Sequence, residues 1–302
     1  MGWRTVVISS TAKLDYKMGY LFIRTSGNTV RIHLSEIALL MIESTSVALT
    51  AYLLVAMEKE KIDVIFCDEK CNPDGMYISF YGSHDTSQKF RSQITWSSQA
   101  KQTIWQHIVI RKITGQAAVL HENNRIKEEE KLMSYLPQVE KGDQTNREGH
   151  AAKVYFNALF GMDFSRDDKD NRINAELNYG YSILLSCISR EIVSNGYATQ
   201  LGIFHDNMFN EFNLACDLME PFRPFVDCMV MKMKHDKFEH DEKMKLISFI
   251  NHKVMIDERE QYVQAAVSIY VKSVLDAMNK EDASIMKCPE YELSLYESDG
   301  VF

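Results

Sequence analysis

The stretch GSHDTSQKFRSQITW, residues 82–96, divides the sequence into two parts of different character. Before Gly82, short segments rich in β-branched and aromatic residues alternate with turn-forming residues, which is the pattern of β-strands. From Thr86 onward glycine and proline are scarce, and apolar residues recur with the helical period of 3.6. The change predicts an α+β protein in which a small β-rich domain, residues 1–84, precedes a larger all-helical domain, residues 85–302.

The predicted elements follow from the same patterns. Strands are expected at residues 5–8, 20–23, 29–32 and 62–66, with one helix between them at about 49–61. In the second part, helices are expected at 87–120, 124–136, 147–160, 171–195, 208–233, 238–251 and 258–279. Gly196 follows one of these helices directly, where a glycine commonly ends a helix.

The overall composition is that of a folded globular protein. Of the 302 residues, 45% are apolar and 25% are charged, which excludes a disordered or collagen-like chain. Apolar runs such as Ile37–Ile42 are far shorter than the ~20 residues of a membrane span, so no membrane association is expected. The N-terminal segment lacks the apolar stretch of a secretory signal. Six cysteines without a CxxC pair predict reduced thiols and a cytoplasmic location.

One stretch of the chain is basic although the protein as a whole is acidic. The formal net charge is -8, yet no Asp or Glu occurs from Thr86 to His121. A local basic stretch within an acidic protein is a stronger indication of a binding partner than the average charge. Its basic side chains are Lys89, Arg91, Lys101, Arg111 and Lys112, and it also contains Trp96 and Trp105.

Candidate ligands for a metal ion occur in three segments of the helical part. Glu148 lies at the start of a predicted helix, His205 lies in a loop, and Asp217 and Glu220 are one turn apart on another helix. Each has a plain alternative explanation, since an acid at a helix start is stabilised by the helix dipole and a loop histidine is commonly solvated. Carboxylates with one imidazole form a hard site that suits Mg²⁺ or Mn²⁺. Spacing alone does not show that they converge.

Two prolines distinguish the third of these segments. Pro221 and Pro224 fall inside an apparent helix, where each interior proline costs ~3 kcal/mol or more. Either one helix ends near Glu220 and another starts at Pro221, or a kink directs the Glu220 carboxylate into a cleft.

Several longer segments resemble one known family. They are REGHAAKVYFNALFG (147–161), NRINAELNYGYSILLSCISREI (171–192), LGIFHDN (201–207), FNLACDLMEPFRPFVD (212–227) and, in the first domain, LSEIALLMIESTSVALTAYLL (34–54). Together they resemble the CRISPR-associated spacer-acquisition integrase and endonuclease, the larger of the two universal adaptation proteins. The sequences of these segments are most similar to those of the family members that accompany type II, single-effector systems. The resemblance covers about residues 5 to 280.

The resemblance implies a fold, an activity and a set of site residues. The fold is a β-rich domain followed by a helical catalytic domain. The activity joins prespacer DNA to the repeat array: a DNA 3′-hydroxyl attacks a phosphodiester, without ATP. The implied ligands of Mg²⁺ or Mn²⁺, which are also the catalytic residues, are Glu148, His205 and Glu220. Asp217 has a supporting role, and Arg147 and Arg223 flank the ligands as candidate contacts of the scissile phosphate. The resemblance also implies that the acid-free stretch is a surface that contacts DNA phosphates. The alternative is an ordinary pair of helices with Trp96 and Trp105 in the core. The loop before His205, GYATQLGIFH, lacks a proline that many members carry.

The partners expected here also come from the resemblance. They are double-stranded DNA, both prespacer and repeat array, a second copy of the chain bound through the β-rich domain, and a small ferredoxin-like protein that bridges the homodimers. Other type II CRISPR proteins are further candidates, all in a prokaryotic cytoplasm. Two alternatives stay open: a catalytically degenerate helical scaffold of the adaptation complex, and a metal-dependent phosphohydrolase acting on small molecules. The acidic tail from Glu281 is either flexible or docked on the ferredoxin-like partner.

Overall fold

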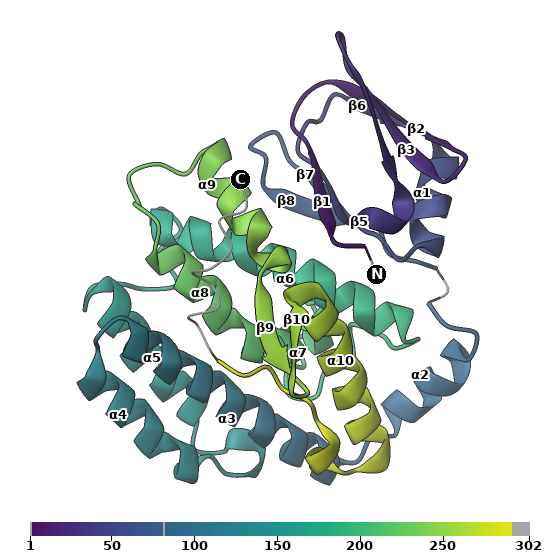
Figure 1. The fold of residues 1–302 in the computed structure, drawn as a ribbon. Coiled ribbons are helices and arrows are strands. Elements are labelled where there is room, and N and C mark those ends of the chain that lie inside the picture. The colour runs from purple at the N-terminus through teal and green to yellow at the C-terminus, as the bar shows by residue number, and fades with distance from the viewer. Residues whose placement is uncertain (1, 81, 292–302) are drawn as a thin grey trace. The chain divides into compact units, whose positions relative to one another are not determined.

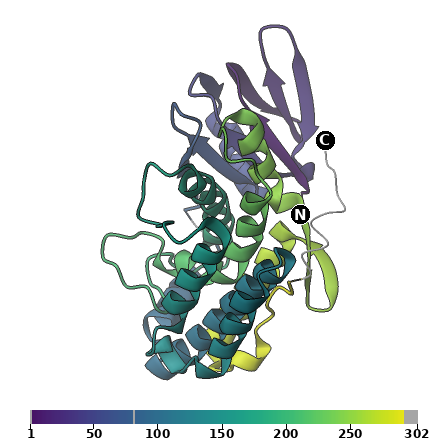
Figure 2. The same ribbon diagram turned by 90° about the vertical axis from the view of Figure 1, so that its left-hand side faces the viewer.

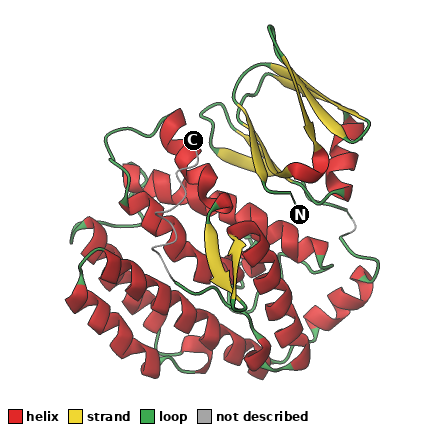
Figure 3. Cartoon of the chain, viewed as in Figure 1, coloured by secondary structure: helices red, strands yellow, loops and turns green. Residues whose placement is uncertain are grey.

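The chain folds into two compact units, Met1–Gly82 and Ser83–Phe302. The computed structural model describes residues 2–80 and 82–291. Strands dominate the first unit and helices dominate the second, as Figures 1 and 3 show, so the predicted α+β class is confirmed. Among the described residues, no helix is both long and apolar enough to cross a membrane.

The first unit contains two four-stranded sheets, with strand orders β1-β5-β7-β8 and β4-β3-β2-β6. Strands β1, β5 and β7 are parallel, whereas β2, β3 and β4 form an antiparallel meander. Leu14, Leu21, Leu40, Leu53 and Val64 are buried in the core of this unit. The elements are β1 (Arg4–Ile8), β2 (Ala12–Lys17), β3 (Tyr20–Arg24), β4 (Thr29–His33), β5 (Ile37–Ile42), β6 (Val47–Leu49), α1 (Ala51–Lys59), β7 (Asp63–Cys67) and β8 (Pro73–Met76).

The sequence patterns missed half of these strands. Strand β5 is the informative case, because all six of its residues are buried. A parallel strand covered on both faces shows a continuous apolar run instead of an alternating pattern. The run Ile37–Ile42 was therefore a strand signal, although the predicted strands did not include it.

The second unit is built from helices around one core. Long helix α3 packs against α4, α5, α8 and α10, and α6 packs against α7, α8, α9 and α10. Figure 2 shows the same arrangement from the side. The helices are α2 (Thr86–Ile94), α3 (Ser98–Glu122), α4 (Ile126–Tyr135), α5 (Arg147–Phe160), α6 (Arg172–Ser194), α7 (Asn213–Met219), α8 (Arg223–Met231), α9 (His240–Ile247) and α10 (Val263–Lys280).

The prediction of an all-helical second domain was wrong in one place. Residues Lys253–Ile256 (β9) and Arg259–Tyr262 (β10) form an antiparallel hairpin, and the helix expected at 258–279 begins only at Val263. The two turn residues, Asp257 and Glu258, have φ of 54° and 60°. Two-residue hairpin turns need positive φ, which glycine and asparagine usually supply. Neither residue occurs here, so the turn carried no hairpin signal.

The helix expected at 87–120 is interrupted. Helix α2 ends at Ile94, and Ser97 caps α3 by accepting the backbone N–H of Ala100 at 3.1 Å. Between them Trp96 is buried, and its indole donates to Asn279 on α10 at 3.1 Å. A serine followed by a helical pattern is a recognisable helix start. The break anchors the start of α3 to α10.

The last described residues pack behind the proline-containing segment. The ring of Tyr291 stacks on Phe225 with centroids 5.1 Å apart, and its hydroxyl donates to the carbonyl oxygen of Pro221 at 2.8 Å. Gly115 on α3 makes room for this ring, because any Cβ at that position would clash with it. Tyr291 thus joins α3 to the segment that leads into α8.

Candidate metal centre

The segment with two prolines is a break between helices. Helix α7 ends at Met219, a 3₁₀ turn covers Glu220–Phe222, and α8 starts at Arg223. Each proline lies in the first turn of a new element, where its missing N–H would have no partner in any case. The sequence left two alternatives for this segment, a helix end near Glu220 and a kink within one helix. The backbone has the helix end. The Glu220 side chain is only 6% exposed.

Glu148 is positioned by the start of α5. Asn146 caps this helix from a left-handed conformation and accepts the backbone N–H of Gly149 at 3.2 Å. Asp143 accepts the N–H groups of Arg147 at 2.8 Å and Glu148 at 2.9 Å. These hydrogen bonds satisfy backbone donors that would otherwise lack partners in the first turn. They hold Glu148 on a rigid helix end.

Glu148 and Glu220 meet on one cation, the ammonium group of Lys112. Lys112 lies on α3 and is 7% exposed. Its Nζ forms an ion pair with Glu148 Oε1 and another, at 2.5 Å, with Glu220 Oε2. The three side chains come from three elements far apart in the sequence. Their convergence is the central feature of the site.

A second cation holds the other oxygen of Glu220. Arg223 Nε lies 3.0 Å from Glu220 Oε1, and the Arg223 guanidinium stacks over the ring of Tyr181 at 4.4 Å. Burial raises the pKa of Glu220, but Arg223 and Lys112 outweigh burial, so the pKa falls below its usual value. Glu220 is therefore ionised at neutral pH.

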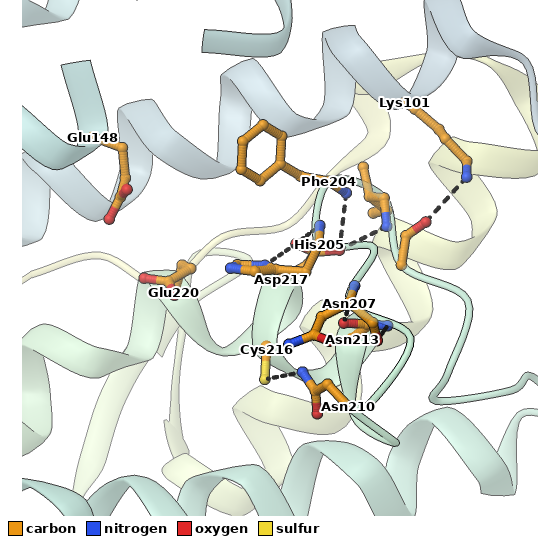
Figure 4. Close-up of polar contacts among 12 residues, drawn as sticks. Lys101, Glu148, Phe204, His205, Asn207, Asn210, Asn213, Cys216, Asp217 and Glu220 are labelled. Atoms are coloured by element: carbon orange, nitrogen blue, oxygen red, sulfur yellow. Dashed lines mark hydrogen bonds and ion pairs between the residues drawn. The ribbon is translucent and has the colours of Figure 1, made fainter. Parts of the chain in front are cut away.

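The loop that carries His205 is held by the buried carboxylate of Asp217. Asp217 Oδ2 accepts the backbone N–H groups of Ile203 at 2.6 Å and Phe204 at 3.0 Å. Its Oδ1 accepts the backbone N–H of His205 at 3.1 Å and contacts the ring Nδ1 at 2.6 Å (Figure 4). This pairing leaves Nε2 as the nitrogen that can bind a cation. The Asp217 hydrogen bond raises the pKa of His205, and the charge of Glu220 adds to the effect.

Helices α2 and α3 support the same loop. Gln93 donates to the carbonyl oxygens of Ala198 at 2.8 Å and Leu201 at 2.9 Å. Lys101 donates to the carbonyl of Gly202 at 3.0 Å, and Phe204 stacks on Trp105 with centroids 4.4 Å apart. These contacts fix the loop although it lacks the proline that the resemblance leads one to expect.

The residues present are of the types that bind a hard divalent cation, although their side chains do not surround one common position. Two carboxylates share a positive charge, and an imidazole lies close enough for Glu220 to affect its pKa. Within residues 2–80 and 82–291, no group of three His, Cys, Asp or Glu side chains is close enough to hold a metal. The donor set is oxygen with one nitrogen, which fits Mg²⁺ or Mn²⁺.

The comparisons with known proteins identify the family. The sequence profile described as CRISPR associated protein Cas1 matches residues 5–247. The chain belongs to the Cas1 family. It is 32% identical to the CRISPR-associated endonuclease Cas1 of Neisseria meningitidis serogroup C (strain 8013), over 96% of this chain and 97% of that protein. The predicted family is therefore confirmed.

Solved structures share the Cas1 fold. A casposase bound to an integration product is 19% identical, with a TM-score of 0.74, over 98% of this chain and 99% of that chain. In a Cas6-RT-Cas1–Cas2 complex the match is 18% identical with a TM-score of 0.69 and covers 94% of this chain and 36% of that chain. At these identities the likeness concerns the fold alone.

The Cas1-family structure changes the prediction for the basic stretch. Lys112 is a buried partner of two carboxylates, so the prediction that it lies on a DNA surface was wrong. Trp96 and Trp105 are 8% and 2% exposed, which supports the alternative that they belong to the core. Lys89 pairs with Asp85 at 3.0 Å, and Lys101 supports the His205 loop. Exposed basic side chains of the stretch remain at Arg91 and Arg111.

The two arginines beside the candidate ligands also differ from each other. Arg223 is committed to Glu220 and Tyr181. Arg147 is half-buried at the start of α5, with its guanidinium 5.5 Å from the ring of Tyr135. Arg223 is held by an ion pair, so the guanidinium of Arg147 is the more available of the two for binding a ligand.

Proposed function

We propose that this Cas1-family chain is a divalent-metal-dependent DNA endonuclease and integrase, which inserts prespacer DNA into a CRISPR repeat array. The convergence of Glu148 and Glu220 on one cation carries the proposal, since three segments far apart in the sequence meet there. Its similarity to a CRISPR-associated endonuclease and to a casposase bound to an integration product supports the same chemistry.

Each residue of the site has a part in this reaction. Glu148, Glu220 and His205 would hold Mg²⁺ or Mn²⁺, which neutralises phosphate oxygens and favours ionisation of a hydroxyl group. Asp217 orients the His205 ring and holds its loop. Arg147 contacts the scissile phosphate through its guanidinium. Arg223 keeps the Glu220 carboxylate ionised and in place.

The reaction is an exchange of one phosphodiester for another. The 3′-oxygen of the incoming DNA forms a bond to the phosphorus of a repeat phosphodiester and loses its proton. The bond from that phosphorus to the old 3′-oxygen breaks, and this oxygen takes up a proton. The number of phosphodiester bonds is unchanged, so the reaction does not consume ATP.

The assembly is part of the proposal. The β-rich unit would pair two copies of the chain, and a small ferredoxin-like partner would bridge two such dimers in the prokaryotic cytoplasm. Two of the structural neighbours are Cas6-RT-Cas1–Cas2 complexes, which supports a second adaptation protein as partner. Two sites held at a fixed distance can then act on the two ends of one prespacer.

A gel assay with labelled DNA tests the proposed function. Full-length protein with Mn²⁺ is expected to convert prespacer and repeat DNA into joined product, and EDTA is expected to abolish it. Absence of any DNA product with Mn²⁺ and the ferredoxin-like partner would instead favour a catalytically degenerate scaffold. Hydrolysis of small phosphate esters without action on DNA would favour a phosphohydrolase.

The exposed arginines of the acid-free stretch give a separate prediction about DNA binding. Each bound phosphate releases counterions, so log K decreases as log salt increases. The size of this negative slope should become smaller by about 0.9 for each phosphate that the protein no longer binds. Arg91→Gln with Arg111→Gln is expected to flatten the slope and to weaken binding to all DNA sequences alike. Lys127→Gln with Lys131→Gln, an equal charge change on acidic helix α4, is the control. An unchanged slope in the first variant would place DNA elsewhere.

A further inference from the structure

Lys112 is the least expected member of the site. Buried lysines are rare unless they are paired, and this one is paired with both carboxylates that would bind the divalent cation. A divalent cation therefore cannot reach both of these oxygens while the Lys112 ammonium remains between them. In its present position Lys112 opposes metal binding, and it can support metal binding only from another position.

Lys112 and Arg223 differ in how firmly they are held. Arg223 pairs with Glu220 and also stacks on Tyr181, whose hydroxyl donates to the buried carboxylate of Asp227. Tyr155 donates to the second oxygen of Asp227 at 3.0 Å, so the platform under Arg223 is fixed. Within the described part of the chain, the polar contacts of Lys112 are the two glutamates. Its four-carbon stem is flexible, whereas the Arg223 guanidinium is planar and stacked.

The charges indicate which of the two side chains, Lys112 or Arg223, would compete with a metal ion for both carboxylates. Two carboxylates that approach one another without a cation repel, and one of them tends to take up a proton. A nearby ammonium removes the repulsion, so the carboxylates can stay ionised and close before any metal arrives. The same ammonium competes with the metal for their oxygens. Arg223 pairs with Glu220 Oε1, and within the described residues no ion pair joins it to Glu148.

We propose that Lys112 is a tethered counter-cation, which holds Glu148 and Glu220 together in the metal-free protein and competes with the divalent cation for them. Lys112 is thus a positioning residue that sets the metal concentration at which the site fills. The inference rests on the proposed function, because it takes Glu148 and Glu220 as metal ligands.

Mn²⁺ binding to full-length protein without DNA tests this inference. Protein freed of metal with EDTA is titrated with Mn²⁺ by electron paramagnetic resonance, and its melting temperature is measured with and without Mn²⁺. Lys112→Met keeps the side-chain length and removes the charge. Lys127→Met makes the same change at an exposed lysine on α4, outside both the site and the candidate DNA surface, and serves as the matched control.

Lys112→Met is expected to bind Mn²⁺ about tenfold more tightly than the original protein, because no tethered charge competes. Its metal-free melting temperature is expected to fall by about 5 °C or more, since the buried carboxylate of Glu220 and the partly exposed carboxylate of Glu148 are left facing each other. Mn²⁺ should then raise its melting temperature by more than it raises that of the original protein. Lys127→Met should stay within about twofold of the original protein in Mn²⁺ affinity.

Unchanged or weaker Mn²⁺ binding by Lys112→Met would overturn the inference. If that variant does not fold without metal, adding Glu148→Gln removes one of the repelling charges. Recovery of folding in the double variant supports the charge argument, and failure to recover contradicts it. Glu220→Ala separates the two proposals. If the original protein binds Mn²⁺ no more tightly than Glu220→Ala, the metal site itself is wrong and both proposals fail.

Discussion

Glu220→Ala is expected to reduce strand joining by about 10³-fold or more, even at saturating Mn²⁺. A metal ion stabilises the charge of the transition state by several kcal/mol, and about 4 kcal/mol corresponds to a factor of 10³. Glu220 would supply one of its ligands, and alanine offers no oxygen in its place. The rate of joined-product formation, measured on gels with labelled DNA, checks this expectation.

The same substitution should also destabilise the protein. Glu220 lies between Lys112 and Arg223, so removing it leaves buried positive charge without its partner. Removing one partner of a buried ion pair costs about 3 kcal/mol or more. The strand-joining activity should therefore be measured at a temperature well below the melting temperature of the variant. Glu211→Gln, an exposed carboxylate a few residues earlier, is the control and should keep full activity. Activity of Glu220→Ala within tenfold of the original protein would contradict the assignment.

A 3′-dideoxy end on the incoming DNA is expected to abolish joined product completely. The proposed nucleophile is the 3′-hydroxyl itself, so its removal leaves no oxygen to form the new bond. Water can still react at a metal site, so cleavage of the repeat DNA should persist at a low level. Denaturing gels that separate joined from cleaved strands measure both outcomes. The matched control is the same oligonucleotide with an ordinary 3′-hydroxyl.

The reverse reaction offers a second measurement of the same chemistry. A pre-formed branched DNA should be resolved without ATP, because one phosphodiester again replaces another. This resolution should need the same cation and the same side chains, Glu148, His205 and Glu220. Joined product from 3′-blocked DNA would show that another group is the nucleophile. If only nicked products form with the partner protein present, hydrolysis is the activity and the transesterification proposal is wrong.

The sequence could predict the α+β class of the fold because local patterns carry it. Strand-like and helix-like periodicities meet near Gly82, and this is where the two compact units divide. The hairpin at Asp257 and Glu258 could not be predicted, since its turn adopts positive φ without glycine or asparagine. Turn geometry there is decided by the packing of β9 and β10 next to α10.

The candidate site was predictable only in part, for a physical reason. Glu148, His205, Asp217 and Glu220 were found through motif resemblance, because each lies in a recognisable segment. Lys112 is 36 residues from Glu148 and belongs to no such segment. Its charge looked like one of a surface run, since sequence alone does not show which face of α3 is buried. Successive residues on a helix point in different directions, so α3 places Lys112 inside the protein and its neighbour Arg111 in solvent.

Tyr291 has a consequence for the order in which the protein is made. Its hydroxyl donates to the Pro221 carbonyl, 70 residues earlier in the chain and directly after Glu220. During synthesis Glu220 leaves the ribosome well before Tyr291 does, and folding of a growing chain proceeds from its N-terminal parts. The backbone behind Glu220 therefore lacks this support until translation has passed residue 291. A nascent chain would therefore hold Glu220 less firmly than the finished chain does.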